Sequence, residues 1–151
     1  MLERRIAYAK DKTEIIGRLK AGDESTGPFV LIADVLVFAA AFGVKRKQRI
    51  RLSDTEEPIR QSVFDRQGYD TMMNLIALHA DSRPDSLADS DEAIEARARA
   101  FEEYANGGLA ILQEELRGAL DVLETLVLLI NGEREKRTAG TDVFELSKLI
   151  S

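Results

Sequence analysis

The stretch PFVLIADVLVFAAAF, residues 28–42, is the longest apolar run of the chain. A helix that is apolar on nearly every side is buried on several faces, so we predict a central core helix here. Pro28 is tolerated in a first helical turn, the three successive alanines favour helix, and Gly43 is a suitable C-terminal cap. The run is too short to cross a bilayer, which takes about 20 residues. Two buried strands are the alternative, because four β-branched residues lie in the run: Val30, Ile32, Val35 and Val37.

Helical patterns lie on both sides of this run. Before it, apolar residues at helical spacing predict a helix over residues 2–20, followed by a loop over residues 21–27. After it, we predict a helix that begins near Pro58 and ends at Gly68. A further amphipathic helix is predicted from Tyr69 to Ala80, and a polar loop follows.

The longest predicted helix covers roughly residues 90–131. Asp89 and Glu92 have the spacing of a capping box at its start, and Asn131-Gly132 would end it. Apolar side chains recur every three or four residues in its second half, as in an amphipathic helix. The dipeptide Gly107-Gly108 predicts a kink or break, because each glycine costs about 1 kcal/mol relative to alanine in a helix interior.

These patterns predict an all-α fold, a compact bundle of about six helices. One short basic extended segment, or a small β element, would follow the second helix. Residues 1–132 are predicted to form a single helical domain, and residues 133–151 a charged linker with a short C-terminal docking helix. With 44% hydrophobic and 32% charged residues, the chain can form a packed core.

Charge is divided unevenly along the chain. Residues 1–51 contain eleven Lys/Arg and six Asp/Glu, whereas residues 52–151 contain ten and twenty-one. The first part ends in KRKQRIR, residues 45–51, which we call the basic segment. Cations at this density can neutralise nucleic-acid phosphates, and the alternative is a solvated loop that balances the acidic part. We predict DNA-backbone contacts from its five cations: Lys45, Arg46, Lys47, Arg49 and Arg51.

An aromatic pair precedes the double glycine in FEEYANGGL, residues 101–109. The block predicts a place where another backbone approaches closely, or a hinge or contact surface. The apolar segment from Val122 to Ile130 is predicted to lie in the core or in a subunit interface. The predicted interface residues are Tyr104, Asn106, Gly107, Gly108, Leu126 and Leu129.

The sequence gives no positive argument for catalysis, a cofactor or a metal. It contains no cysteine, which excludes disulfides and thiolate metal sites. Asp34 lies alone in the apolar run, and we interpret it as ion-paired with an arginine of the N-terminal helix or partly exposed. His79 is the sole histidine and has no second ligand at helical spacing, so we interpret it as a helix-end residue. Neighbouring glutamates such as Glu102 and Glu103 point in different directions on a helix.

Several segments together resemble a known family. They are DVLVFAAAFGVKRKQRI, EEPIRQSVF, NLIALH and FEEYANGGLAIL, which fall between residues 34 and 112. This set resembles the DNA phosphorothioation-associated protein 4 family, which accompanies the bacterial Dnd systems that place sulfur in the DNA backbone. The resemblance implies an accessory role in a restriction-linked antiphage defence system, and it offers no catalytic residues to transfer. The lack of cysteine is compatible with the cytoplasm, where we expect the protein to be.

Two kinds of function remain open from the sequence. The first is a non-enzymatic accessory protein that contacts the DNA backbone through the basic segment. The second is an adaptor or regulator that assembles other proteins of the defence system without touching DNA, through the acidic C-terminal part and an apolar helix over residues 109–130. Candidate partners are therefore DNA, other Dnd proteins and a second copy of the chain, whereas a membrane is not expected.

Overall fold

The computed structural model describes residues 4–22, 25–81 and 87–134. Contacts divide the chain into two compact units, Met1–Arg117 and Gly118–Ser151. The described residues are mostly helical, and their only strands form two pairs of two-residue strands. This confirms the predicted all-α class, whereas the predicted domain boundary at residue 132 remains a prediction.

The N-terminal region differs from the predicted helix over residues 2–20. It contains strand β1 (Arg5–Ile6), the 3-10 helix η1 (Lys10–Lys12) and helix α1 (Thr13–Leu19). β1 pairs antiparallel with β4 (Ile59–Arg60), a partner more than fifty residues away in the sequence. Local spacing carries no information about such a partner, which is why the first half of the predicted helix is wrong.

The predicted loop over residues 21–27 contains a second strand pair. Strands β2 (Ala21–Gly22) and β3 (Ser25–Thr26) form a short antiparallel hairpin. The chain then returns to α1, because the Phe29 amide donates to the Leu19 carbonyl at 3.1 Å. This contact keeps the start of the apolar run extended.

Helix α2 (Ile32–Lys45) is the predicted core helix, shifted toward the C-terminus. It begins four residues after Pro28, where the Asp34 carboxylate accepts the Leu31 backbone amide at 2.9 Å. Asp34 also accepts the Tyr69 hydroxyl at 2.7 Å, so its observed partners are not the predicted arginine. Gly43 lies inside the helix and is not its cap.

Two shorter helices follow the basic segment. Helix α3 (Gln61–Arg66) begins later than the Pro58 prediction because β4 occupies the preceding residues. Gly68 has a φ of 77° and separates α3 from α4 (Asp70–Ala80), which confirms both the break and the second helix. The basic segment starts in the last residue of α2 and a turn, and residues 48–52 form no strand, so the predicted small β element is not present there.

Helix α5 (Asp91–Glu115) runs without interruption through the double glycine, so the predicted break there is wrong. Its N-cap is Ser90, whose hydroxyl accepts the Ala93 amide at 3.2 Å, and the predicted cap at Asp89 is one residue early. Helix α5 ends before Gly118, which has a φ of 73°.

The second unit contains a further helix over residues 122–134, within the described chain. This helix passes the predicted end at Asn131-Gly132. The predicted single helix over residues 109–130 is therefore two helices separated by the turn around Gly118. The rest of the predicted linker and the predicted C-terminal docking helix, residues 135–151, lie outside the described residues.

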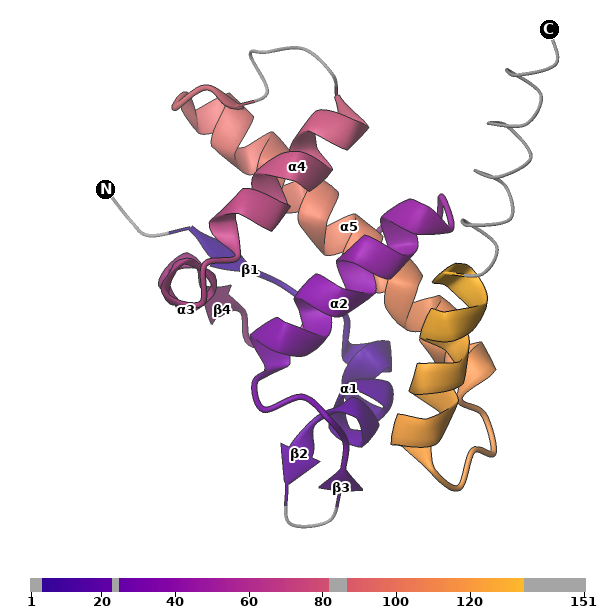
Figure 1. The fold of residues 1–151 in the computed structure, drawn as a ribbon. Coiled ribbons are helices and arrows are strands. Elements are labelled where there is room, and N and C mark those ends of the chain that lie inside the picture. The colour runs from indigo at the N-terminus through magenta and orange to yellow at the C-terminus, as the bar shows by residue number, and fades with distance from the viewer. Residues whose placement is uncertain (1–3, 23–24, 82–86, 135–151) are drawn as a thin grey trace, which may run out of the picture. The chain divides into compact units, whose positions relative to one another are not determined.

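The core of the first unit is built around the crossing of α2 and α5, which share the most extensive contact of the described chain. Figure 1 shows α2 lying across α5, with α4 crossing the N-terminal half of α5. Phe64 of α3 meets Phe101 of α5 edge to face, with ring centroids 5.5 Å apart. The largest fully buried side chains are Phe64, Phe101, Ile6, Leu19, Leu36, Leu109, Leu112, Leu116 and Val35.

Candidate nucleic-acid interface

The basic segment begins in the turn that ends α2. The Gln48 amide donates to the Gly43 carbonyl at 2.8 Å, and the Lys47 amide donates to the Val44 carbonyl at 3.1 Å. These two bonds form a Schellman cap, whose left-handed position is glycine in most proteins. Here Lys47 occupies it, with a φ of 56°. The turn thus places an exposed lysine in the left-handed backbone conformation, which suits glycine.

The five cations of the basic segment are not equivalent. Lys45, Lys47, Arg49 and Arg51 are exposed, and Arg46 is half-buried with its guanidinium 5.0 Å from the centroid of the Phe42 ring. Arg49 is bound to α5, because its Nε donates to the Glu103 carboxylate at 2.8 Å. Its guanidinium also lies 5.4 Å from the centroid of the Tyr104 ring.

Beyond the turn, the backbone of the segment is bonded to the middle of α5. The Ile50 amide donates to the Glu103 carbonyl at 3.1 Å. The Asn106 side-chain amide donates to the carbonyls of Ile50 and Arg51 at 3.3 and 3.2 Å. Asn106 is only 4% exposed, so the donor end of these partly buried bonds is shielded from water, where an unmade hydrogen bond is costly. The segment is therefore fixed to α5 along its inner side.

Glycines bring the two backbones close enough for this arrangement. A Cβ on Gly107 would collide with the Gln48 carbonyl, and one on Gly108 would collide with the Ala39 carbonyl. Gly43 of α2 faces the Tyr104 carbonyl in the same way. The double glycine thus serves close helix packing, as predicted for this block, although it does not break the helix.

The block around the double glycine faces the protein itself. Asn106, Gly107 and Gly108 are buried against the basic segment and α2, and Tyr104 is half-buried beneath Arg49. Leu126 is buried and Leu129 is half-buried in the helix over residues 122–134. The structure places these six residues in two separate units, and their role as an interface stays a prediction.

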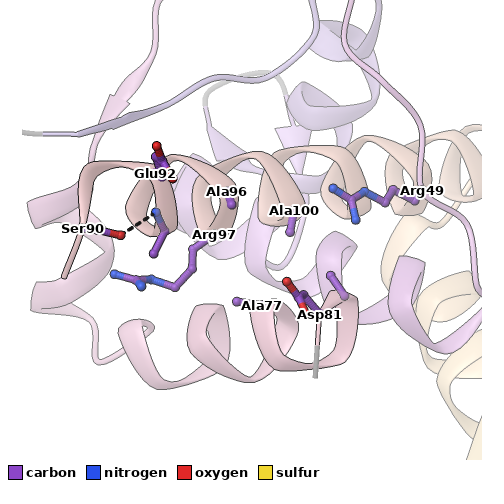
Figure 2. A pocket seen from close by; sticks show the side chains of 10 residues that line it. Arg49, Ala77, Asp81, Ser90, Glu92, Ala96, Arg97 and Ala100 are labelled. Carbon is purple, nitrogen blue, oxygen red and sulfur yellow. Dashed lines mark hydrogen bonds between the residues drawn. The ribbon is translucent and has the colours of Figure 1, made fainter. Parts of the chain in front are cut away.

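A pocket of about 490 Å³ lies beside the basic segment, between α4 and the N-terminal half of α5. Figure 2 shows Arg49 at one end of it and Arg97 toward the other, with small alanine side chains between them. Two carboxylates, Asp81 and Glu92, also line it. The positive and negative side chains balance, so the pocket has no clear preference for an anion.

The titratable groups near this region have structural partners. Glu102 is half-buried, and burial raises its pKa, although the Ala7 amide at 2.6 Å and the nearby Arg4 act in the opposite direction. The hydrogen bond to Asp34 raises the pKa of the Tyr69 hydroxyl. His79 is exposed, with its ring 5.9 Å from the Tyr104 ring. These are packing and capping roles.

Within the described ranges, no group of three or more His, Cys, Asp or Glu side chains is placed to hold a metal ion. None of the described helices has the length and apolar character needed to cross a membrane. The sequence alone missed Glu103 and Asn106 as the residues that hold the basic segment. Asn106 was predicted as an interface residue from its place beside the double glycine, but its bonds to the basic segment had no signal in the sequence.

The sequence matches the family model described as DNA sulphur modification system-associated protein 4 over residues 5–149. No curated protein and no solved structure matches the chain.

Proposed function

Because the chain belongs to the DNA sulphur modification system-associated protein 4 family, we propose that it contacts the DNA backbone through the basic segment as a non-enzymatic accessory protein of such a system. The family description supports association with a DNA sulphur modification system. The proposal places the protein in the cytoplasm, in a restriction-linked antiphage defence.

The observation that carries this proposal is the backbone of Lys47. An L-residue in the left-handed region costs roughly 1–2 kcal/mol, which glycine avoids. Lys47 nevertheless occupies this position, exposed at the tip of the turn. A residue that opposes local backbone preference is a reason to look for function at that position. A phosphate contact would explain why a cation stands where glycine would be more stable.

The surrounding charges support the same role. Lys45 and Arg51 are exposed on either side of Lys47. Such cations release counterions from DNA when they meet phosphates, so affinity falls steeply as salt rises. The segment offers no helix for the major groove, so contacts to the backbone are favoured over reading of bases.

Fluorescence anisotropy with a short duplex over a salt series tests the proposal. The wild type is compared with a charge-reversal variant of Lys45, Lys47 and Arg51, and with a matched reversal of exposed arginines elsewhere (Arg5, Arg60 and Arg66). We expect salt-dependent binding that the first variant loses and the second keeps. Equal affinities of the two variants, or no binding at low salt, would refute DNA contact by the segment. Phosphorothioate and unmodified duplexes run in parallel report any sensing of the modification.

The strained turn allows a sharper test with single substitutions. Lys47→Gly should raise the free energy of unfolding by about 1 kcal/mol and weaken DNA binding, because it relieves the left-handed backbone and removes a cation. Lys45→Gly removes the same charge inside α2 and should lower stability by about 1 kcal/mol. Thermal unfolding and anisotropy give the two effects separately. A Lys47→Gly protein that binds DNA like the wild type would contradict the role of Lys47.

A second candidate function is a protein adaptor within the same system. It is favoured by large apolar side chains that are exposed in the second unit, among them Leu120, Leu123 and Leu128. Exposed apolar clusters commonly mark contacts with other proteins. Pull-down with the other proteins of the system tests this candidate, with Leu123→Ser and Leu128→Ser expected to weaken capture. Unchanged capture by the double variant would count against it.

A further inference from the structure

Arg49 of the basic segment forms an ion pair with Glu103 of α5. Its Nε lies 2.8 Å from a Glu103 carboxylate oxygen, and its guanidinium lies against the Tyr104 ring. The Glu103 side chain is only 12% exposed, so this carboxylate depends on its partner for neutralisation. Figure 2 shows Arg49 extending along the wall of the pocket between α4 and α5.

The backbone next to Arg49 is held by the same turn of α5. Glu103 accepts the Ile50 amide with its carbonyl and the Arg49 side chain with its carboxylate. One residue therefore binds both the main chain and the side chain of the segment. Asn106, one turn further along, binds the next two carbonyls.

We propose that Arg49 is a positioning residue of the DNA-contacting segment and not one of its phosphate contacts. Its pairing with Glu103 and Tyr104 fixes residues 48–51 on α5, so that Lys47 and Arg51 are presented to DNA in one arrangement. This inference rests on the proposed function. A segment that is already ordered loses less conformational freedom on binding, which raises affinity without adding a contact.

The alternative, in which Arg49 turns outward to a phosphate, is disfavoured by what it would leave behind. Glu103 would lose its cation while remaining largely buried, and Tyr104 would lose the guanidinium against its ring. A phosphate approaching Arg49 would also meet the negative charge of Glu103. Lys47 and Arg51 can bind a phosphate without breaking any of these contacts.

Three single substitutions separate the two roles. Arg49→Lys keeps the charge but loses the planar group that donates through Nε and stacks on tyrosine. Arg49→Met removes the charge and keeps most of the side-chain length. Lys47→Met is the matched control, because it removes the same charge from an exposed residue of the same segment. Each is titrated with duplex DNA over a salt series.

The slope of log affinity against log salt distinguishes positioning from contact. Each phosphate contact contributes about 0.9 to that slope. We expect Lys47→Met to lower the slope by about that amount. Both Arg49 variants should bind roughly fivefold more weakly with the wild-type slope, because ordering and not a contact is lost. Arg49→Lys with wild-type affinity, together with a slope loss in Arg49→Met, would overturn the proposal.

Amide hydrogen exchange of the free protein provides the second measurement. The Ile50 amide, bonded to Glu103, should exchange faster in both Arg49 variants and at the wild-type rate in Lys47→Met. Unchanged Ile50 exchange in the Arg49 variants would refute the positioning role whatever the DNA result. Absence of DNA binding by the wild type would instead refute the proposed function, and the exchange data would still report whether Arg49 orders the segment.

Discussion

Residues 109–116 and residues 120–130 have the same apolar spacing, but they differ in burial. In the first stretch, Leu109, Leu112 and Leu116 are almost completely buried. In the second, Leu120 is fully exposed and Leu123 is 51% exposed. Spacing of this kind predicts a helix and an apolar face, but it does not identify what the face packs against. For residues 109–116 the answer comes from α2 and the N-terminal region, far away in the sequence.

The largest expected effect comes from the close approach that buries the first stretch. Gly108→Val would place a branched side chain against the Ala39 carbonyl, so we expect a loss of well over 3 kcal/mol or failure to fold. Gly17→Ala is the control, since a Cβ there meets nothing within 4 Å. It should stabilise the protein by about 0.5–1 kcal/mol. Thermal unfolding followed by circular dichroism measures both, and a stable, folded Gly108→Val protein would contradict the close packing.

A matched pair of leucines tests the comparison itself. Leu112→Ala removes a fully buried side chain and should cost about 2–5 kcal/mol. Leu123→Ala, at an exposed position of the second stretch, should change the free energy of unfolding by no more than about 0.5 kcal/mol. Urea denaturation of the two variants gives the difference. Equal losses would mean that residues 120–130 are buried in solution as deeply as residues 109–116.

A smaller effect is expected where the basic segment meets α5. Asn106→Leu keeps the approximate shape but leaves the carbonyls of Ile50 and Arg51 without their buried donor, at a cost of about 1–3 kcal/mol. Gln113→Leu removes an exposed hydrogen bond to the Asp11 carbonyl and should cost no more than about 0.5 kcal/mol. Denaturation midpoints compare the two, and a neutral Asn106→Leu would show that these bonds contribute little.

The smallest effect depends on pH and involves Glu102. Burial raises its pKa in the folded state above the unfolded value of 4.5, so the folded protein holds this proton more tightly. The resulting stabilisation is present below the unfolded pKa and is lost as the pH rises through the raised one. Glu102→Gln should remove this fall, which thermal unfolding across that window would detect. A Glu102→Gln profile parallel to that of the wild type would refute the shift.

Prediction from sequence succeeded where local signals decide the structure. The apolar run gave α2, and Gly68 with the pattern after it gave α4. The uninterrupted α5 shows where a local signal misleads, because packing against Ala39 outweighs the helix cost of two glycines. The pairing of β1 with β4 depends on distant residues, so spacing within residues 2–20 could not reveal it.

The candidate site likewise combines a feature that local sequence reveals with features that depend on distant residues. The density of cations in residues 45–51 was visible in the sequence, but their different surroundings were not. Whether an arginine faces solvent or Glu103 depends on a helix that begins forty residues later. The left-handed backbone at Lys47 also lacked a local signal, because lysine is an unusual residue for that position.

The attachment of residues 48–51 to α5 has a consequence for proteolysis. Trypsin cleaves after lysine and arginine, and the basic segment is the densest run of such residues in the chain. A protease needs several residues of extended backbone free of other bonds, whereas here the Ile50 amide and the next two carbonyls are engaged. Cleavage after Arg49 or Arg51 therefore requires the segment to detach from α5 first. The rate of tryptic cutting at these two bonds measures how often that detachment occurs.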